Sequence, residues 1–80
     1  MIKRRELMTE KYKSSFIKDE DISVSVSKRY EGDTRIEIVE IKHLPSGFKA
    51  SAEDTVQINA YNKALKLLED EINSFIWSQF

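Results

Sequence analysis

Residues 22–27 alternate strictly between β-branched apolar side chains and serine. Successive side chains of a strand point to opposite faces, so this pattern predicts a half-buried strand with the isoleucine and both valines facing inward. Two turn signals follow it. Gly32-Asp33 is typical of a tight hairpin turn, and Pro45 with Gly47 is typical of a second turn. The pattern predicts three antiparallel strands, the second over 35–42.

The two turns also predict how the strands pair. A two-residue loop at 32–33 and a four-residue loop at 44–47 each fix a register, and residues directly opposite one another share a face of the sheet. Both registers give the same apolar face. Its three predicted rows are Ile22/His43/Phe48, Val24/Ile41/Ala50 and Val26/Val39/Ala52. This agreement indicates an antiparallel meander.

Ile36 and Ile38 do not fit this face, because they alternate onto the opposite one. A β-bulge near residues 38–39 would turn them inward. Without a bulge they form an apolar patch on the outer face, which the N-terminal segment or a second subunit must cover. The sequence leaves both alternatives open.

A helical period replaces the strand period after the third strand. Ser51 or Asp54 can cap the helix, and residues 54–78 carry an apolar stripe at helical spacing. Such a helix is longer than the strands, so its last turns should extend past the sheet. The stripe and the residues beside it are Tyr61, Ala64, Leu65, Leu68, Ile72, Phe75 and Ile76. We expect Val24, Ile41 and Leu65 to belong to the core.

The N-terminal residues 1–20 are polar with scattered apolar positions. Met8, Tyr12 and Phe16 suit one face of a short helix, and a mobile arm is the alternative. The predicted fold is therefore α+β, in the order α-β-β-β-α, as a single domain over 1–80. The charged first ten residues contain no apolar run, so we expect no signal peptide, no membrane span and a cytoplasmic location.

The composition excludes several kinds of site. The chain has no cysteine and one histidine, which excludes disulfides, thiolate metal sites and a multi-histidine metal site. No nucleophile–base set or glycine-rich phosphate loop is present. We expect His43, beside the second turn, to stabilise that turn. The sequence predicts a protein without catalytic residues, metal or cofactor.

The net charge of −1 does not indicate a nucleic-acid binder, but the charge is uneven. Residues 1–18 hold six basic and two acidic residues, and residues 53–71 hold five acidic and two basic. Two readings are open: the two ends attract each other in the fold, or the basic arm contacts phosphate or an acidic partner.

A longer string resembles the catalytic domain of class I peptide chain release factors and related ribosome-rescue hydrolases. It comprises Ile41-Lys42-His43-Leu44-Pro45-Ser46-Gly47, then Gln57, then Lys63-Ala64-Leu65-Lys66-Leu67-Leu68, with Asp21-Ile22-Ser23-Val24 like the family's opening strand. The resemblance covers about 21–72. The family's Gly-Gly-Gln loop, between the first two strands, is replaced here by Tyr30-Glu31-Gly32-Asp33-Thr34. The resemblance implies a shared scaffold without the catalytic glutamine.

Helix–β–β–β–helix is also the order of double-stranded RNA-binding domains. Those domains place lysines at the start of the last helix, where they meet phosphates. Here that place holds Glu53 and Asp54, which would repel phosphate.

Two functional hypotheses follow. The first is a non-enzymatic binding or regulatory module with a release-factor-like scaffold, which contacts the ribosome, RNA or the translation apparatus. Its predicted phosphate contacts are Lys3, Arg4, Arg5, Lys28, Arg29, Arg35 and Lys42. The second is a protein-interaction module, either a homodimer or an inhibitor of a cellular protein, that uses the aromatic end of the helix. Its predicted contacts are Phe75, Ile76, Trp77 and Phe80.

Overall fold

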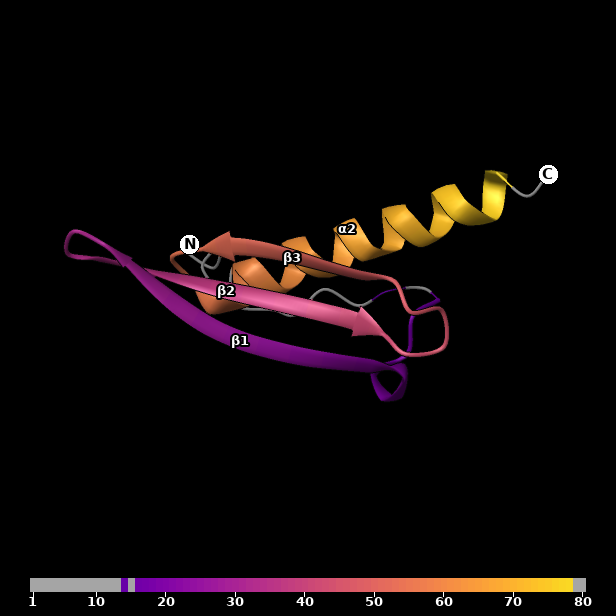
Figure 1. Cartoon of the computed structure of the whole chain (residues 1–80), viewed down its shortest axis with the longest axis horizontal. Coiled ribbons are helices and arrows are strands. Elements are labelled where there is room, and N and C mark those ends of the chain that lie inside the picture. The colour runs from indigo at the N-terminus through magenta and orange to yellow at the C-terminus, as the bar shows by residue number, and fades with distance from the viewer. Residues whose placement is uncertain (1–13, 15, 79–80) are drawn as a thin grey trace, which may run out of the picture.

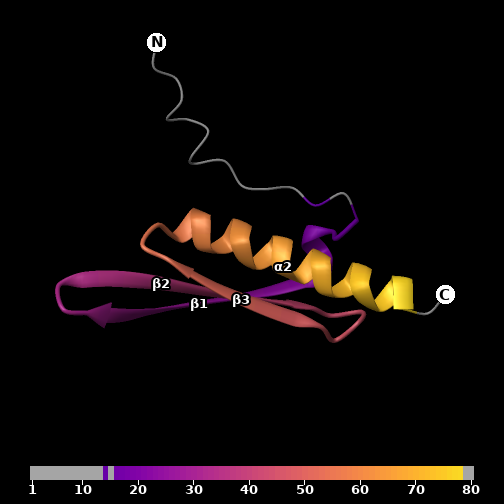
Figure 2. The same ribbon diagram turned by 90° about the horizontal axis from the view of Figure 1, so that it is seen from above.

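The computed structural model describes residue 14 and residues 16–78. A 3-10 turn, η1 (Asp19–Asp21), leads into three strands, β1 (Ile22–Glu31), β2 (Thr34–His43) and β3 (Lys49–Asp54), and one helix, α2 (Gln57–Ser78). The strands form one antiparallel sheet in the order β1-β2-β3, and α2 lies across one face of it (Figures 1 and 2). The α+β meander with a long C-terminal helix is confirmed. The predicted N-terminal helix or arm lies mostly outside the described residues.

The pairing registers are those predicted from the turns. Val24 lies opposite Ile41 and Val26 opposite Val39, while Ala50 and Ala52 lie opposite the same two β2 residues from the other side. Gly32 has a φ of 65°, and no non-glycine residue in the described part of the chain has a positive φ. A positive φ at the first central position only is typical of a type II′ hairpin turn, which suits the twist of paired strands.

The β1–β2 hairpin is longer than the alternation alone predicts. β1 continues to residue 31 rather than ending at 27, and β3 stops opposite Glu37. The tip of the hairpin therefore extends past β3 and past the first turn of α2 as a two-stranded arm (Figures 1 and 2).

No bulge interrupts the pairing of β1 with β2, because the register runs unbroken from Ile22–His43 to Glu31–Thr34. Of the two alternatives that the sequence left open, the bulge near residues 38–39 is therefore excluded. Ile36 and Ile38 lie on the outer face, away from α2, and each is half-buried. Their inward neighbour Glu37 is buried instead, and its carboxylate accepts a contact of 2.8 Å from the Nε of Arg35.

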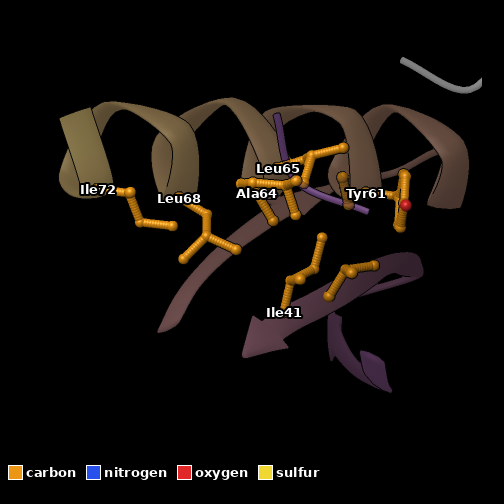
Figure 3. Packing of buried hydrophobic residues seen from close by; sticks show 9 residues of the cluster. Ile41, Tyr61, Ala64, Leu65, Leu68 and Ile72 are labelled. Atoms are coloured by element: carbon orange, nitrogen blue, oxygen red, sulfur yellow. The ribbon is translucent and has the colours of Figure 1, made fainter. Parts of the chain in front are cut away.

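The core lies between α2 and the inner face of β2 and β3. Ile41 and Val39 of β2 and Leu68 of α2 are fully buried. Figure 3 shows Ile41 and Leu68 in the space between the sheet and the helix. The helix begins at Gln57, three residues later than predicted, because the chain first completes β3. The other buried apolar residues are Ile17, Ala60, Tyr61, Ala64, Leu65 and Ile72.

The inner face of β1 is the exception to this packing. α2 contacts β2 and β3 extensively, and Val24 and Val26 remain 44% and 45% exposed although they point to the same side as the helix. The prediction that Val24 belongs to the core is therefore wrong. One helix about 10 Å across cannot cover three strands spaced about 4.8 Å apart, so the edge strand farthest from it stays open.

Candidate interaction surfaces

The C-terminal end of α2 exposes three large apolar side chains. Ile72 is the last buried residue of the helix, and beyond it Phe75, Ile76 and Trp77 are 51%, 43% and 73% exposed. Trp77 has the highest exposed fraction of the large hydrophobic side chains in the described part of the chain. This end of the helix extends beyond the strands (Figure 1). The predicted contact residue Phe80 lies outside the described residues.

Phe75 connects this helix end to the sheet. Its ring lies 5.4 Å from that of Phe48, centroid to centroid, at an interplanar angle of 65°. Edge-to-face pairs of this kind are favourable, so the contact holds the helix against the residue that directly precedes β3. Ile76 and Trp77 directly follow Phe75 in the sequence, and their side chains are exposed.

A shallow groove runs from the Phe48–Phe75 pair along α2, between the helix and β3. Ala50, Ser51, Leu67 and Glu71 contribute to its lining. Leu67 is 47% exposed and was not among the residues predicted for this surface. Its neighbours Leu65 and Leu68 are buried, so the signal in the sequence was a third leucine that does not fit the inward stripe.

The cations predicted to bind phosphate are divided between the two faces of the sheet. Arg29 and Lys42 lie on the outer face, while Lys28 and Arg35 lie on the side of α2. Lys3, Arg4 and Arg5 fall outside the described residues. The outer face of the three strands carries three basic and three acidic side chains: Arg29, Lys42 and Lys49 with Glu31, Glu40 and Glu53. This face therefore has no excess of positive charge.

Both predicted arginines of the sheet are engaged by carboxylates. The guanidinium of Arg29 donates to both carboxylate oxygens of Glu53, at 3.0 and 2.9 Å, and to Glu31 at 3.0 Å. These bonds, from Glu53 first and then Glu31, raise the pKa of Arg29 and keep it charged. This bidentate pairing uses most of the guanidinium N–H groups with which Arg29 would otherwise bind a phosphate.

A second ionic contact fixes the start of α2. Asp54 accepts a hydrogen bond at 3.0 Å from the backbone N–H of Val56 and one at 2.8 Å from the Nζ of Lys63. The Lys63 contact, followed by the Val56 N–H, holds the pKa of the Asp54 carboxyl below its usual range. The prediction that Ser51 or Asp54 caps the helix is wrong: both residues lie within β3, and Asp54 bonds to the N–H of Val56, which precedes the first helical residue, Gln57.

A second groove lies between β1 and the first turns of α2. It has a volume of about 610 Å³ and is lined by Asp19, Ile22, Val24, Gln57, Ile58 and Tyr61. Burial, together with the nearby negative charge of Asp19, raises the pKa of the Tyr61 hydroxyl. The lining therefore combines apolar side chains with the carboxylate of Asp19, the amide of Gln57 and the hydroxyl of Tyr61.

The one histidine, His43, is the last residue of β2 and directly precedes the turn. The Nδ1 of His43 lies 2.8 Å from the Oγ of Ser46, and the N–H of Gly47 donates to the His43 carbonyl at 2.8 Å. Gly47 has a φ of 81°, which closes the four-residue loop. The prediction that His43 stabilises this turn is confirmed.

In comparisons with known proteins, no family model, no curated protein and no solved structure matches this chain. Within the described residues no group of His, Cys, Asp and Glu side chains could hold a metal ion, and no helix there is long and apolar enough to cross a membrane.

Proposed function

We propose that this protein is a non-enzymatic protein-interaction module that docks a partner protein on the C-terminal end of α2. The observation that carries the proposal is the exposure of Ile76 and Trp77, directly after the Phe48–Phe75 contact that fixes the helix end. Aromatic side chains held on a rigid element lose little conformational freedom on binding and are typical anchors of protein interfaces.

The charges of the sheet favour this proposal over a phosphate-binding one. The carboxylates of Glu53 and Glu31 occupy Arg29, and Glu37 occupies Arg35. A surface that binds nucleic acid needs an excess of available cations on one face, and the outer face is balanced. Contact with the ribosome or RNA through a release-factor-like scaffold stays a prediction of the resemblance alone.

In-cell photo-crosslinking tests the proposal. A photoreactive amino acid replaces Trp77 in one variant and Lys66 in the other, in cells that express the chain. Lys66 lies eleven residues earlier, about three helical turns away on the same side of α2, and is exposed. We expect one discrete protein adduct from position 77 and none, or far less, from position 66.

The adducts distinguish the alternatives. Crosslinks to RNA, or equal crosslinking from both positions, would contradict docking at the helix end. The salt dependence of the captured contact adds an independent criterion. A contact through phosphates weakens steeply between 50 and 200 mM salt because counterions are released, whereas an apolar contact does not.

A further inference from the structure

The free edge of β1 is a second surface, separate from the helix end. Leu44 donates its N–H to the carbonyl of Asp21 at 2.9 Å, so that carbonyl points toward β2. Backbone groups of successive residues in a strand point to opposite neighbours. The odd-numbered residues of β1 therefore bond to β2, and the even-numbered ones direct their N–H and C=O groups outward. These are Ile22, Val24, Val26, Lys28 and Tyr30.

This edge lacks the usual protection of edge strands. β1 is ten residues long, has no proline or glycine, and pairs with β2 without a bulge. Its first six residues, 22–27, are all uncharged. Proteins normally blunt an exposed edge with charges, proline, a bulge or a short strand, because an open edge is a template for another strand. Within the described residues β1 pairs with β2 on one side only, and no strand pairs with its other edge.

The charges on either side of the uncharged stretch have opposite signs. Asp19, Glu20 and Asp21 precede it, and Lys28 and Arg29 follow it. If two copies of this segment paired in parallel, like charges would lie side by side. In the antiparallel arrangement the acidic end of each copy meets the basic end of the other, and the uncharged residues pair among themselves. The strand is thus electrostatically complementary to itself in one orientation only.

We propose that β1 pairs antiparallel with β1 of a second copy, with the twofold axis at Ser25, to form a continuous six-stranded sheet. This register places Val24 of each copy opposite Val26 of the other, so the exposed valines join on one face. Asp21 of each copy lies opposite Arg29 of the other. Pairing through the even-numbered residues uses the outward N–H and C=O groups and leaves the bonds between β1 and β2 intact.

The two helices do not obstruct this arrangement. Both lie on the same face of the joined sheet, each over its own β2 and β3. Their axes are then about four strand spacings apart, or roughly 19 Å. A helix with its side chains is about 10–12 Å across, so the helices do not clash. The second copy adds its strand without any change in the fold of the first.

Cysteine crosslinking tests the register. Ser25 bonds toward β2, so two Ser25 residues on the axis form a non-hydrogen-bonded pair with Cα atoms about 4.5 Å apart, within the range of a disulfide. The chain has no other cysteine. We expect S25C to form covalent dimers under mild oxidation. S23C alone should not, since its two copies are about 13 Å apart, whereas a mixture of S23C and S27C should crosslink.

A charge-swap experiment tests the pairing itself by sedimentation velocity. Ser25 is exposed on the outer face, so the fold should tolerate S25K and S25E, as melting curves can verify. Each variant alone places like charges directly opposite across the axis and should be monomeric at concentrations where the original chain is dimeric. An equimolar mixture of the two should restore the dimer.

Three results would overturn the proposal: an original chain that stays monomeric up to millimolar concentration, equal crosslinking by S25C and S23C, or dimers of S25K and S25E alone. Loss of the dimer in an Ile76→Ser/Trp77→Ser variant with no effect of S25E would place the homodimer at the helix end instead. These outcomes are independent of the photo-crosslinking at position 77, so either surface can fail without the other.

Discussion

Arg29 on β1 and Glu53 on β3 form a bidentate ion pair that spans the full width of the sheet, with N–O distances of 3.0 and 2.9 Å. The central strand β2 lies between them, and Arg29 is opposite Ile36 while Glu53 is opposite Ile38. The pair therefore crosses the outer face at these two isoleucines. This accounts for their partial burial without a bulge or a covering subunit.

The ion pairs at Glu53 and Asp54 predict how stability depends on pH. Their hydrogen bonds to Arg29 and to Lys63 lower the pKa of each carboxyl. A carboxyl whose pKa is lowered by folding stabilises the folded state above its ordinary pKa of about 4, and that contribution is lost as the pH falls through the lowered value. We expect the Tm to be steady above pH 5 and to fall below pH 4.

Asp54→Asn provides the matched comparison. Asparagine keeps an oxygen for the N–H of Val56 but does not titrate. The variant should therefore lose part of the decline in Tm below pH 4. Identical slopes in the variant and the original chain would show that Asp54 does not carry the dependence.

The burial pattern predicts which core substitutions are costly. Ile41 and Leu68 are fully buried, so replacing either with alanine should lower the free energy of unfolding by about 2–5 kcal/mol. Val24 faces the same side but is nearly half exposed, so Val24→Ala should cost less than about 1 kcal/mol. Denaturant unfolding measures all three. Equal losses at Val24 and Ile41 would mean that β1 is covered.

The contrast between Val24 and Ile41 shows which part of the core the sequence predicts and which part it does not. Alternation and turn chemistry correctly placed Val24, Ile41 and Ala50 in one row on one face. They could not show that the row is only partly covered, because coverage depends on where α2 lies across the sheet. Hydrophobic alternation reports the face of a strand, and not whether a second layer reaches it.

The candidate site was likewise only partly predictable. Phe75, Ile76 and Trp77 were predicted from the length of the helix against the length of the strands, which is a local calculation. The pairing of Arg29 with Glu53 was missed, since the two residues are 24 positions apart and meet only through the register of two hairpins. Leu67 was missed because its sequence signal, a leucine outside the inward stripe, is weak, since single exposed leucines are common on protein surfaces.

Removing residues 77–80 should leave the fold intact. Trp77 is largely exposed, and the last buried residue, Ile72, and the Phe48–Phe75 contact both precede the truncation. We expect a nearly unchanged Tm together with loss of the photo-crosslinked partner when the crosslinker is placed at Ile76. A truncated chain that fails to fold would place these residues in the core.

We predict that the protein does not hydrolyse peptidyl-tRNA. In the family that the sequence resembles, the water-positioning glutamine lies on a glycine-rich loop between the first two strands, and positioning of this kind supplies much of the rate enhancement. Here a two-residue turn, Gly32-Asp33, occupies that place, and Gln57 starts α2 instead. Peptide release from ribosomes above background by the purified chain would contradict this prediction.

A quantitative pull-down with and without ribonuclease tests the central claim, that a protein partner docks on the end of α2. The bait is the original chain, an Ile76→Ser/Trp77→Ser variant, or a Lys42→Glu variant that reverses an exposed cation on the outer face. The claim predicts one protein partner that survives ribonuclease and Lys42→Glu and is lost from the helix-end variant. A partner that disappears with ribonuclease or Lys42→Glu, and is retained by the helix-end variant, would contradict it.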